Sequence, residues 1–315
     1  MVDGNQVRTL FMKLQSWSLA SLLLLVTLSA GAQTLYVADM ANKKIQTYDA
    51  TTGAVINPSF ITGLNNPWGI AVAGNLLFVS DLDTGDVGAY DATTGVYLFD
   101  LAGTAGSIDV AVSGNTVYVL VYSSGKVMTF DATTGAAISP SFITGNLAGG
   151  QGIAVAGGNL YGAMNGDSAI RLWDTWTEVL LNSTFATTLA YPEDVDVSGN
   201  TLYVTAGGSG SGGGGLNRKV ETFDATTGDL INNNFVSQNG TSYVVARDGV
   251  LYVSGAASGT GVRAYDATTC TALSGFTPIA GSFRGVALSA VPEPATAGLL
   301  VLASALAFRR GNARR

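Results

Sequence analysis

The chain has 315 residues, and its 22 Asp and Glu against 15 Lys and Arg give a formal net charge of −7 at neutral pH. This acidic balance argues against nucleic acid or anionic lipid head groups as partners, because each phosphate would meet like charge. The chain has no histidine and only one cysteine, Cys270, which excludes Ser-His-Asp triads, histidine-ligated catalytic zinc and an internal disulfide.

Residues 1–32 have the pattern of a signal peptide. Met12 and Lys13 precede an apolar run at residues 19–28, and the sequence from Ala30 to Ala32 is an A-x-A cleavage site. The run is too short to anchor the chain firmly in a membrane. We therefore predict cleavage after Ala32 and export of the protein. Residues 1–11 are interpreted as a mis-start upstream of the signal.

One phrase recurs through residues 33–290, as in Tyr48-Asp-Ala-Thr-Thr-Gly53. Its six copies are marked by Asp49, Asp91, Asp131, Asp174, Asp224 and Asp266. The copies are about 42 residues apart, except for one longer interval that contains the Gly-rich stretch at residues 207–215. A period of this length in strand-rich units is typical of a β-propeller with one blade per repeat.

A second phrase alternates with the first and consists of two apolar strands around a Gly-Asn turn, as in residues 69–79. Together the phrases predict a blade of four strands, here at residues 70–73, 76–80, 87–91 and 96–101. The chain begins with the second strand of a blade, at residues 35–38, and ends with a lone first strand at residues 285–289. Pairing these two segments closes a six-bladed, all-β ring and removes two sheet edges. The shared blade would contain one C-terminal and three N-terminal strands.

The repeated aspartate is better explained by turn chemistry than by metal binding. Asp can accept a bond from the backbone N–H two residues further on, and the closing Gly supplies a left-handed conformation. Cys270 replaces that Gly and should cost about 1 kcal/mol. The acidic stretch from Asp81 to Asp86 is likewise interpreted as a solvated turn, because it lacks the later Glu of a calcium loop. The basic pair Arg218-Lys219 is interpreted as edge-protecting charge.

The repeated body resembles the bacterial propellers of the NHL and YVTN kind, which are secreted repeat proteins. Leu35-Tyr-Val-Ala-Asp39, Pro67-Trp-Gly-Ile-Ala-Val72 and the aromatic-Asp-x-x-Thr-Gly hairpins carry this resemblance. It implies the fold and says little of the function.

The residues that lead into the first strand of each blade are expected to line one mouth of the central channel. Aligned by the strand pattern, they are Trp68, Asp109, Gln151, Glu193, Asp194, Tyr243 and Arg284. This ring could bind a polar partner, such as a sugar of an extracellular polysaccharide stacked on an aromatic ring, or a surface protein. Alternatively, its polar groups are simply solvated.

A calcium site is the third interpretation of this ring, and no other cofactor is predicted. The chain distantly resembles lactone-hydrolysing propellers, which implies that Asp109, Glu193 and Asp194 could hold Ca²⁺ through oxygen ligands. A calcium-dependent hydrolase of lactones or sugars would then need Glu193 or Asp194 as the base, with a raised pKa, because histidine is absent.

Residues 291–315 form a tripartite C-terminal tag. Val291, Pro292, Glu293 and Pro294 are followed by an uncharged apolar stretch at residues 295–308 and then by Arg309 and Arg310. A helix of this length would be too short to span a bilayer well. The order of these parts resembles the PEP-CTERM signal of Gram-negative bacteria, which implies an exosortase as sorting partner after passage through the secretion machinery.

Together, these patterns predict three regions: a helical signal peptide at 1–32, a propeller at 33–290 and a sorting signal with a hydrophobic helix at 291–315. We expect transient retention at the inner membrane, followed by placement at the cell surface, the outer envelope or the extracellular matrix. There the protein is predicted to act as a non-catalytic binding or structural module, with the calcium-dependent hydrolase as the alternative.

Overall fold

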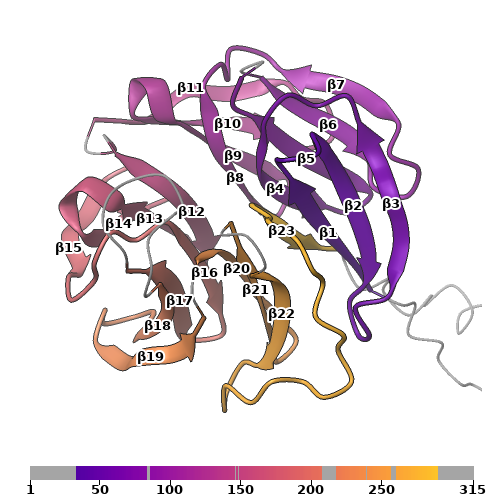
Figure 1. Cartoon of the computed structure of the whole chain (residues 1–315). Coiled ribbons are helices and arrows are strands. Elements are labelled where there is room, and N and C mark those ends of the chain that lie inside the picture. The colour runs from indigo at the N-terminus through magenta and orange to yellow at the C-terminus, as the bar shows by residue number, and fades with distance from the viewer. Residues whose placement is uncertain are drawn as a thin grey trace, which may run out of the picture. The chain divides into compact units, whose positions relative to one another are not determined.

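The computed structural model describes residues 33–289, except 84–85, 146, 148, 208–217, 239 and 257–259. The predicted signal peptide with Ala30 and Ala32, the sorting motif with its arginines, and both predicted terminal helices lie outside these residues. The described residues form one compact all-β unit in which six sheets follow one another in a ring (Figure 1). None of them belongs to a helix long and apolar enough to cross a membrane.

Each sheet is one antiparallel blade. The strands of a blade are called A to D, from the innermost strand at the centre of the ring to the outermost. Blade 1 contains β1 (Thr34–Asp39), β2 (Lys44–Asp49), β3 (Val55–Thr62) and β23 (Val286–Leu288). Blade 2 contains β4 (Pro67–Ala73), β5 (Leu76–Asp81), β6 (Val87–Asp91) and β7 (Tyr97–Leu101). Blade 3 contains β8 (Ser107–Ser113), β9 (Thr116–Val121), β10 (Lys126–Asp131) and β11 (Ala137–Thr144).

The second half of the ring repeats this arrangement. Blade 4 contains β12 (Gly150–Ala156), β13 (Asn159–Met164), β14 (Ala169–Asp174) and β15 (Leu180–Ala186). Blade 5 contains β16 (Asp194–Ser198), β17 (Thr201–Ala206), β18 (Lys219–Asp224) and β19 (Leu230–Ser237). Blade 6 contains β20 (Thr241–Arg247), β21 (Val250–Gly255) and β22 (Gly261–Asp266). Two short 3-10 helices, η1 (Tyr122–Ser124) and η2 (Asn165–Asp167), follow the B strands of blades 3 and 4.

The predicted closure of the ring is confirmed. The C-terminal strand β23 pairs antiparallel with β1, with Leu35 opposite Leu288 and Val37 opposite Val286. The A strand of blade 1 therefore comes from the end of the chain, whereas its other three strands come from the beginning. Blade 6 deviates from the predicted four strands, because its outer segment joins β22 only through isolated bridges at Ile279 and Ala272.

The turn chemistry predicted for the repeated aspartate is also present. In blade 1, Asp49 Oδ1 accepts bonds from the backbone N of Thr51 at 3.0 Å and of Thr52 at 2.7 Å. Bonds from Thr52, led by that of its hydroxyl, lower the pKa of Asp49. Gly53 closes the turn with φ +72°, and a Cβ there would lie 2.2 Å from the carbonyl oxygen of Thr277 in blade 6. Glycine is needed both for its conformation and for the close approach of the blades.

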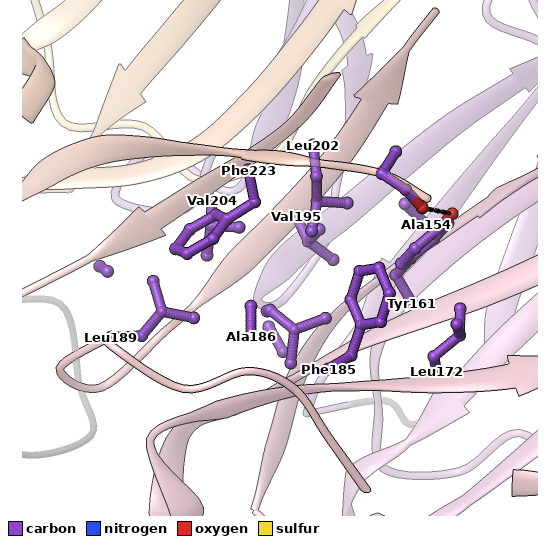
Figure 2. Packing of buried hydrophobic residues seen from close by; sticks show 14 residues of the cluster. Ala154, Tyr161, Leu172, Phe185, Ala186, Leu189, Val195, Leu202, Val204 and Phe223 are labelled. Atoms are coloured by element: carbon purple, nitrogen blue, oxygen red, sulfur yellow. Dashed lines mark hydrogen bonds between the residues drawn. The ribbon is translucent and has the colours of Figure 1, made fainter. Parts of the chain in front are cut away.

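Neighbouring blades are joined by apolar clusters and by tyrosine hydroxyls. Figure 2 shows the cluster between blades 4 and 5, where Leu202 and Phe223 lie among the side chains of both sheets. Within it, the hydroxyl of Tyr161 donates to the backbone carbonyl of Ala225 at 2.7 Å. The same B-strand hydroxyl reaches the Ala carbonyl in the C–D turn of the next blade at three other junctions, which start from Tyr36, Tyr203 and Tyr252. The repeat therefore supplies both the blade and its link to the next one.

Candidate functional site

The six A strands surround a central cavity of about 150 Å³. Most of the residues that line it are Val, Ile, Ala and Leu, although polar atoms make up most of the cavity surface. The polar residues that line it are Asp109, Asp194, Asp196, Tyr243 and Arg247. Three of the seven residues predicted for the channel ring therefore lie along the cavity wall.

The strand registers divide the predicted ring into two sets. One position, opposite the equivalent B-strand residue, is occupied by Asp109, Gly152 and Asp194. Counted from the neighbouring pairs, the same position in the other blades holds Gly69, Tyr243 and Gly285. The preceding position holds Trp68, Gln151, Glu193 and Arg284. Successive side chains along a strand point to opposite sides, so the two sets have different surroundings. Gln151, like Glu193 and Arg284, is buried.

The aspartates in the first set connect adjacent A strands. Asp109 Oδ2 accepts the backbone N–H of Ile153 in blade 4 at 2.8 Å. Asp194 Oδ2 accepts that of Val244 in blade 6, also at 2.8 Å. Asp196 repeats the contact one step along β16, where its Oδ2 accepts the N–H of Ala246 at 2.7 Å. The strands that these carboxylates connect belong to different sheets and are not paired by backbone hydrogen bonds. The carboxylates therefore serve mainly to hold neighbouring blades together.

Glycines on the preceding blades make room for these carboxylates. A Cβ on Gly69 would lie 2.3 Å from Asp109 Oδ1, and one on Gly152 would lie 2.6 Å from Asp194 Oδ1. Any side chain there would displace a carboxylate or separate the strands. The two Gly-Asp pairs explain why an inner strand position can carry acidic groups at all.

Burial makes the cavity carboxylates weak acids. It raises the pKa of Asp109 to about 7 and that of Asp196 to about 6. The pKa of Asp194 is raised well above its ordinary value, first by burial and then by the nearby charge of Asp109. Burial and the same two carboxylates raise the pKa of Tyr243. Ionisation of this group of residues therefore opposes the folded state.

We expect Asp109→Asn to increase the free energy of unfolding by about 2 kcal/mol near pH 8, with a gain that disappears as the pH falls to about 4. The pKa of Asp109 is higher in the folded chain than in the unfolded chain, so its contribution to stability is present at low pH and is lost as the pH rises through about 7. The Asn side-chain oxygen can still accept the N–H of Ile153. Urea unfolding of parent and variant across this pH range measures the difference. An unchanged slope of stability against pH in the variant would show that another group titrates.

A second polar network lies on the side of Glu193 and Arg284. Glu193 forms an ion pair with Arg218 through Oε2 and accepts the hydroxyl of Ser242 at 3.1 Å. Ser242 in turn accepts Nη1 of Arg284 at 2.9 Å. The guanidinium of Arg284 lies 4.1 Å from the ring centroid of Trp68, a cation–π distance. Arg218, Glu193, Ser242 and Arg284 are all buried, whereas Trp68 is partly exposed.

This network corrects the interpretation of Arg218 as edge-protecting charge. Its side chain is only 2% exposed and compensates the charge of Glu193. The network also limits stacking on Trp68. Arg284 covers one face of the indole ring, so a sugar could stack only on the other face. Within the described residues, Nε and Nη2 of Arg218 and Nε of Arg284 are buried without a hydrogen-bond partner. Arg218 pairs directly with Glu193, whereas Arg284 is linked to this carboxylate only through the hydroxyl of Ser242.

The three residues considered for calcium do not converge. Asp109 and Asp194 each bond to a backbone amide along the cavity, while Glu193 is paired with Arg218. Across the described residues, no three Asp, Glu, His or Cys side chains lie close enough together to hold a metal ion. The cavity aspartates are thus suited to holding the blades together. The second network is suited to holding a cationic group against the indole ring of Trp68.

Asp196, Arg218 and Ser242 were not among the predicted site residues. Asp196 follows Asp194 at the strand spacing of two in the segment 194–197, a pattern that could have indicated a second inward carboxylate. Arg218 carries no comparable signal, since its partner Glu193 lies 25 positions earlier and the Gly-rich stretch intervenes.

Comparison with known proteins gives the fold alone. No known protein family matches the chain, and no curated protein resembles it in sequence. A chain from a crystal structure of a nidogen/laminin complex is similar over 82% of this chain and 99% of its own length, with a TM-score of 0.68 and 12% identity. The computationally designed Ika8 protein matches over 79% of this chain and 73% of its own, with a TM-score of 0.49 and 16% identity. The first similarity supports the six-bladed propeller.

Proposed function

We propose that the protein is an exported, surface-sorted β-propeller that acts as a non-catalytic binding or structural module of the cell envelope or extracellular matrix. One observation carries this proposal: each carboxylate considered for catalysis is held by a backbone amide or a guanidinium. Asp109 and Asp194 bond to the inner strand of a neighbouring blade and Glu193 compensates a buried guanidinium, so each of these groups has a structural task. A rigid ring with fixed polar groups suits binding better than turnover.

The channel mouth is the proposed contact for a partner such as an extracellular polysaccharide or a surface protein. Trp68 is partly exposed and lies against the buried Arg284. The buried guanidinium groups have N–H donors with no partner among the described residues, which favours a ligand with acceptor groups. Large aromatic and Arg side chains are also the residues that most often dominate binding energy. The proposed partners in sorting are the secretion machinery and an exosortase.

We expect deletion of residues 291–315 to release the folded propeller into the medium. The deletion removes Pro292, Glu293, Pro294 and the arginines, but it leaves β23 and its pairing with β1 intact. Immunoblotting of cell and medium fractions, with circular dichroism of the released protein, measures the outcome. A matched control is Arg309→Ser with Arg310→Ser, which should cause partial release. If the deleted form stays cell-associated in the parent's amount, these residues do not position the protein.

A further inference from the structure

A hollow of about 430 Å³ lies between the face of blade 3 and the C–D turn of blade 4. This is in the size range of small-molecule sites in proteins. Its lining includes the aromatic side chains Tyr118, Phe142 and Trp176 and the polar side chains Ser139, Thr175 and Glu178. Tyr118 and Phe142 pack edge to face, with centroids 5.4 Å apart. The hollow is separate from the central cavity, with which it shares no lining residue.

The turn that borders this hollow departs from the repeat. In blades 2, 3 and 5, the third residue of the C–D turn is a Thr whose hydroxyl donates to an Asn in the A–B turn. The pairs are Thr93 with Asn75 at 2.7 Å, Thr133 with Asn115 at 2.9 Å and Thr226 with Asn200 at 2.7 Å. In blade 4, Trp176 replaces the Thr and Gly158 replaces the Asn. The backbone contact is unchanged, because Thr175 N donates to Gly158 O at 2.8 Å as Ala132 N does to Asn115 O.

The two replacements fit each other. Trp176 Nε1 lies 3.3 Å from the position that a Cβ on Gly158 would occupy. An Asn at this position would therefore crowd the indole. Trp176 is nevertheless 87% exposed, so packing on the glycine leaves most of its ring uncovered. Burial of the ring in the fold cannot explain why the tryptophan is there.

A third replacement in the same turn adds a carboxylate to the hollow. Glu178 stands where four of the other copies have Gly, and its φ of +61° is in the left-handed region. A non-glycine residue there costs about 1 kcal/mol. The turn has thus lost a Thr–Asn hydrogen bond and gained backbone strain, and all three new residues line one hollow. Cys270 carries the same strain in blade 6, but among the described residues it is only in blade 4 that the strained residue lines a hollow together with an exposed aromatic ring. Backbone strain of this kind is often retained at functional sites.

We propose that this hollow binds a neutral pyranose unit of a polysaccharide. An uncovered indole offers a flat apolar surface to the C–H face of a sugar ring. Glu178 can accept sugar hydroxyls, and Ser139 can both donate and accept. The hydroxyl of Thr175 donates to the carbonyl oxygen of Gly158 at 2.9 Å, so towards a sugar it can only accept. The carboxylate and the net charge of −7 disfavour an acidic sugar. This site goes beyond the proposed channel-mouth contact and does not depend on it.

The test compares the parent protein with Trp176→Thr, which restores the residue found in the other five copies. The probes are the methyl glycosides of glucose, galactose, mannose, N-acetylglucosamine and glucuronic acid, with binding measured by calorimetry and tryptophan fluorescence. We expect a neutral glycoside to bind the parent and Trp176→Thr to weaken that binding by about tenfold or more. The melting temperature of the variant should equal or exceed the parent's, because a Thr is compatible with the turn.

Two matched variants separate this site from other surfaces. Thr133→Trp places an exposed indole in the corresponding turn of blade 3, beside Asn115, and should add no binding. Trp68→Ala removes the aromatic ring at the channel mouth, so binding that this variant loses is assigned to the mouth and binding that it keeps is assigned to the hollow. The inference is overturned if the parent binds no neutral glycoside, if Trp176→Thr binds like the parent, or if Trp68→Ala alone abolishes binding. Preference for glucuronic acid would also overturn it.

Discussion

A chain that ends at residue 284 is expected to aggregate rather than to fold as a monomer. The truncation removes β23, whose residues Val286, Ala287 and Leu288 are at most 6% exposed. Burial of a Val and a Leu side chain contributes about 1.5–3 kcal/mol each, and each lost backbone bond adds about 1 kcal/mol. The sum approaches the whole stability of a typical domain, about 5–15 kcal/mol. The inner strand of one blade would be missing, and β1 would be left as an unpaired edge.

The control for this truncation is a chain that ends at residue 290, which lacks the predicted sorting signal but keeps β23. Size-exclusion chromatography and thermal unfolding should give a monomer with a cooperative transition for the control alone. Equal melting temperatures and monomeric elution for both chains would show that the ring does not need its closing strand.

Glu193→Gln should lower the free energy of unfolding by about 3 kcal/mol or more. The substitution keeps the shape of the side chain but leaves Arg218 and Arg284 buried without the carboxylate that compensates them. Breaking one partner of a buried ion pair is costly because the remaining charge stays desolvated. Asp109→Asn is expected to raise the free energy of unfolding instead. Opposite effects of the two substitutions would show that these carboxylates, which were considered together as calcium ligands, have different roles.

Urea unfolding at neutral pH measures this effect, with Glu178→Gln as the matched control at an exposed carboxylate. The double variant Glu193→Gln with Arg218→Gln should recover part of the loss, because it removes the uncompensated charge as well. A change below about 0.5 kcal/mol for Glu193→Gln would mean that solvent reaches the pair.

The repeat predicted the blades, their number and the closure, because these depend on local strand and turn patterns that recur every 42 residues or so. The sequence did not show which residues of the predicted channel ring face the cavity, and this has a physical reason. Register shifts occur where β4, β8, β12 and β20 begin, between Pro67 and Ile70 in the first of them. Such irregularities change which residue faces the cavity, and an apolar pattern alone does not reveal them.

Contacts between blades were also beyond prediction from local pattern. Glu193 accepts the hydroxyl of Ser242 from the next blade, and Arg284 reaches Ser242 from the end of the chain, where the ring closes. Arg218 lies within the same blade as Glu193, but the long Gly-rich interval between them hides the pairing. In contrast, the replacements at Gly158 and Trp176 were visible in the aligned repeats. The close approach of Trp176 to Gly158, however, is a property of the folded chain that the aligned sequence does not contain.

The closure of the ring also determines where mechanical load enters it. Gln33 Nε2 donates to the carbonyl oxygen of Ser289 at 3.1 Å, so the two ends of the propeller lie together on one sheet. A tether attached after residue 289 pulls directly on the three-residue strand β23. The other five blades have all their strands continuous within the chain, so tension reaches them only through β23 and its neighbours. The strand that completes the ring would thus be the first to bear any load applied at the C-terminal end of the propeller.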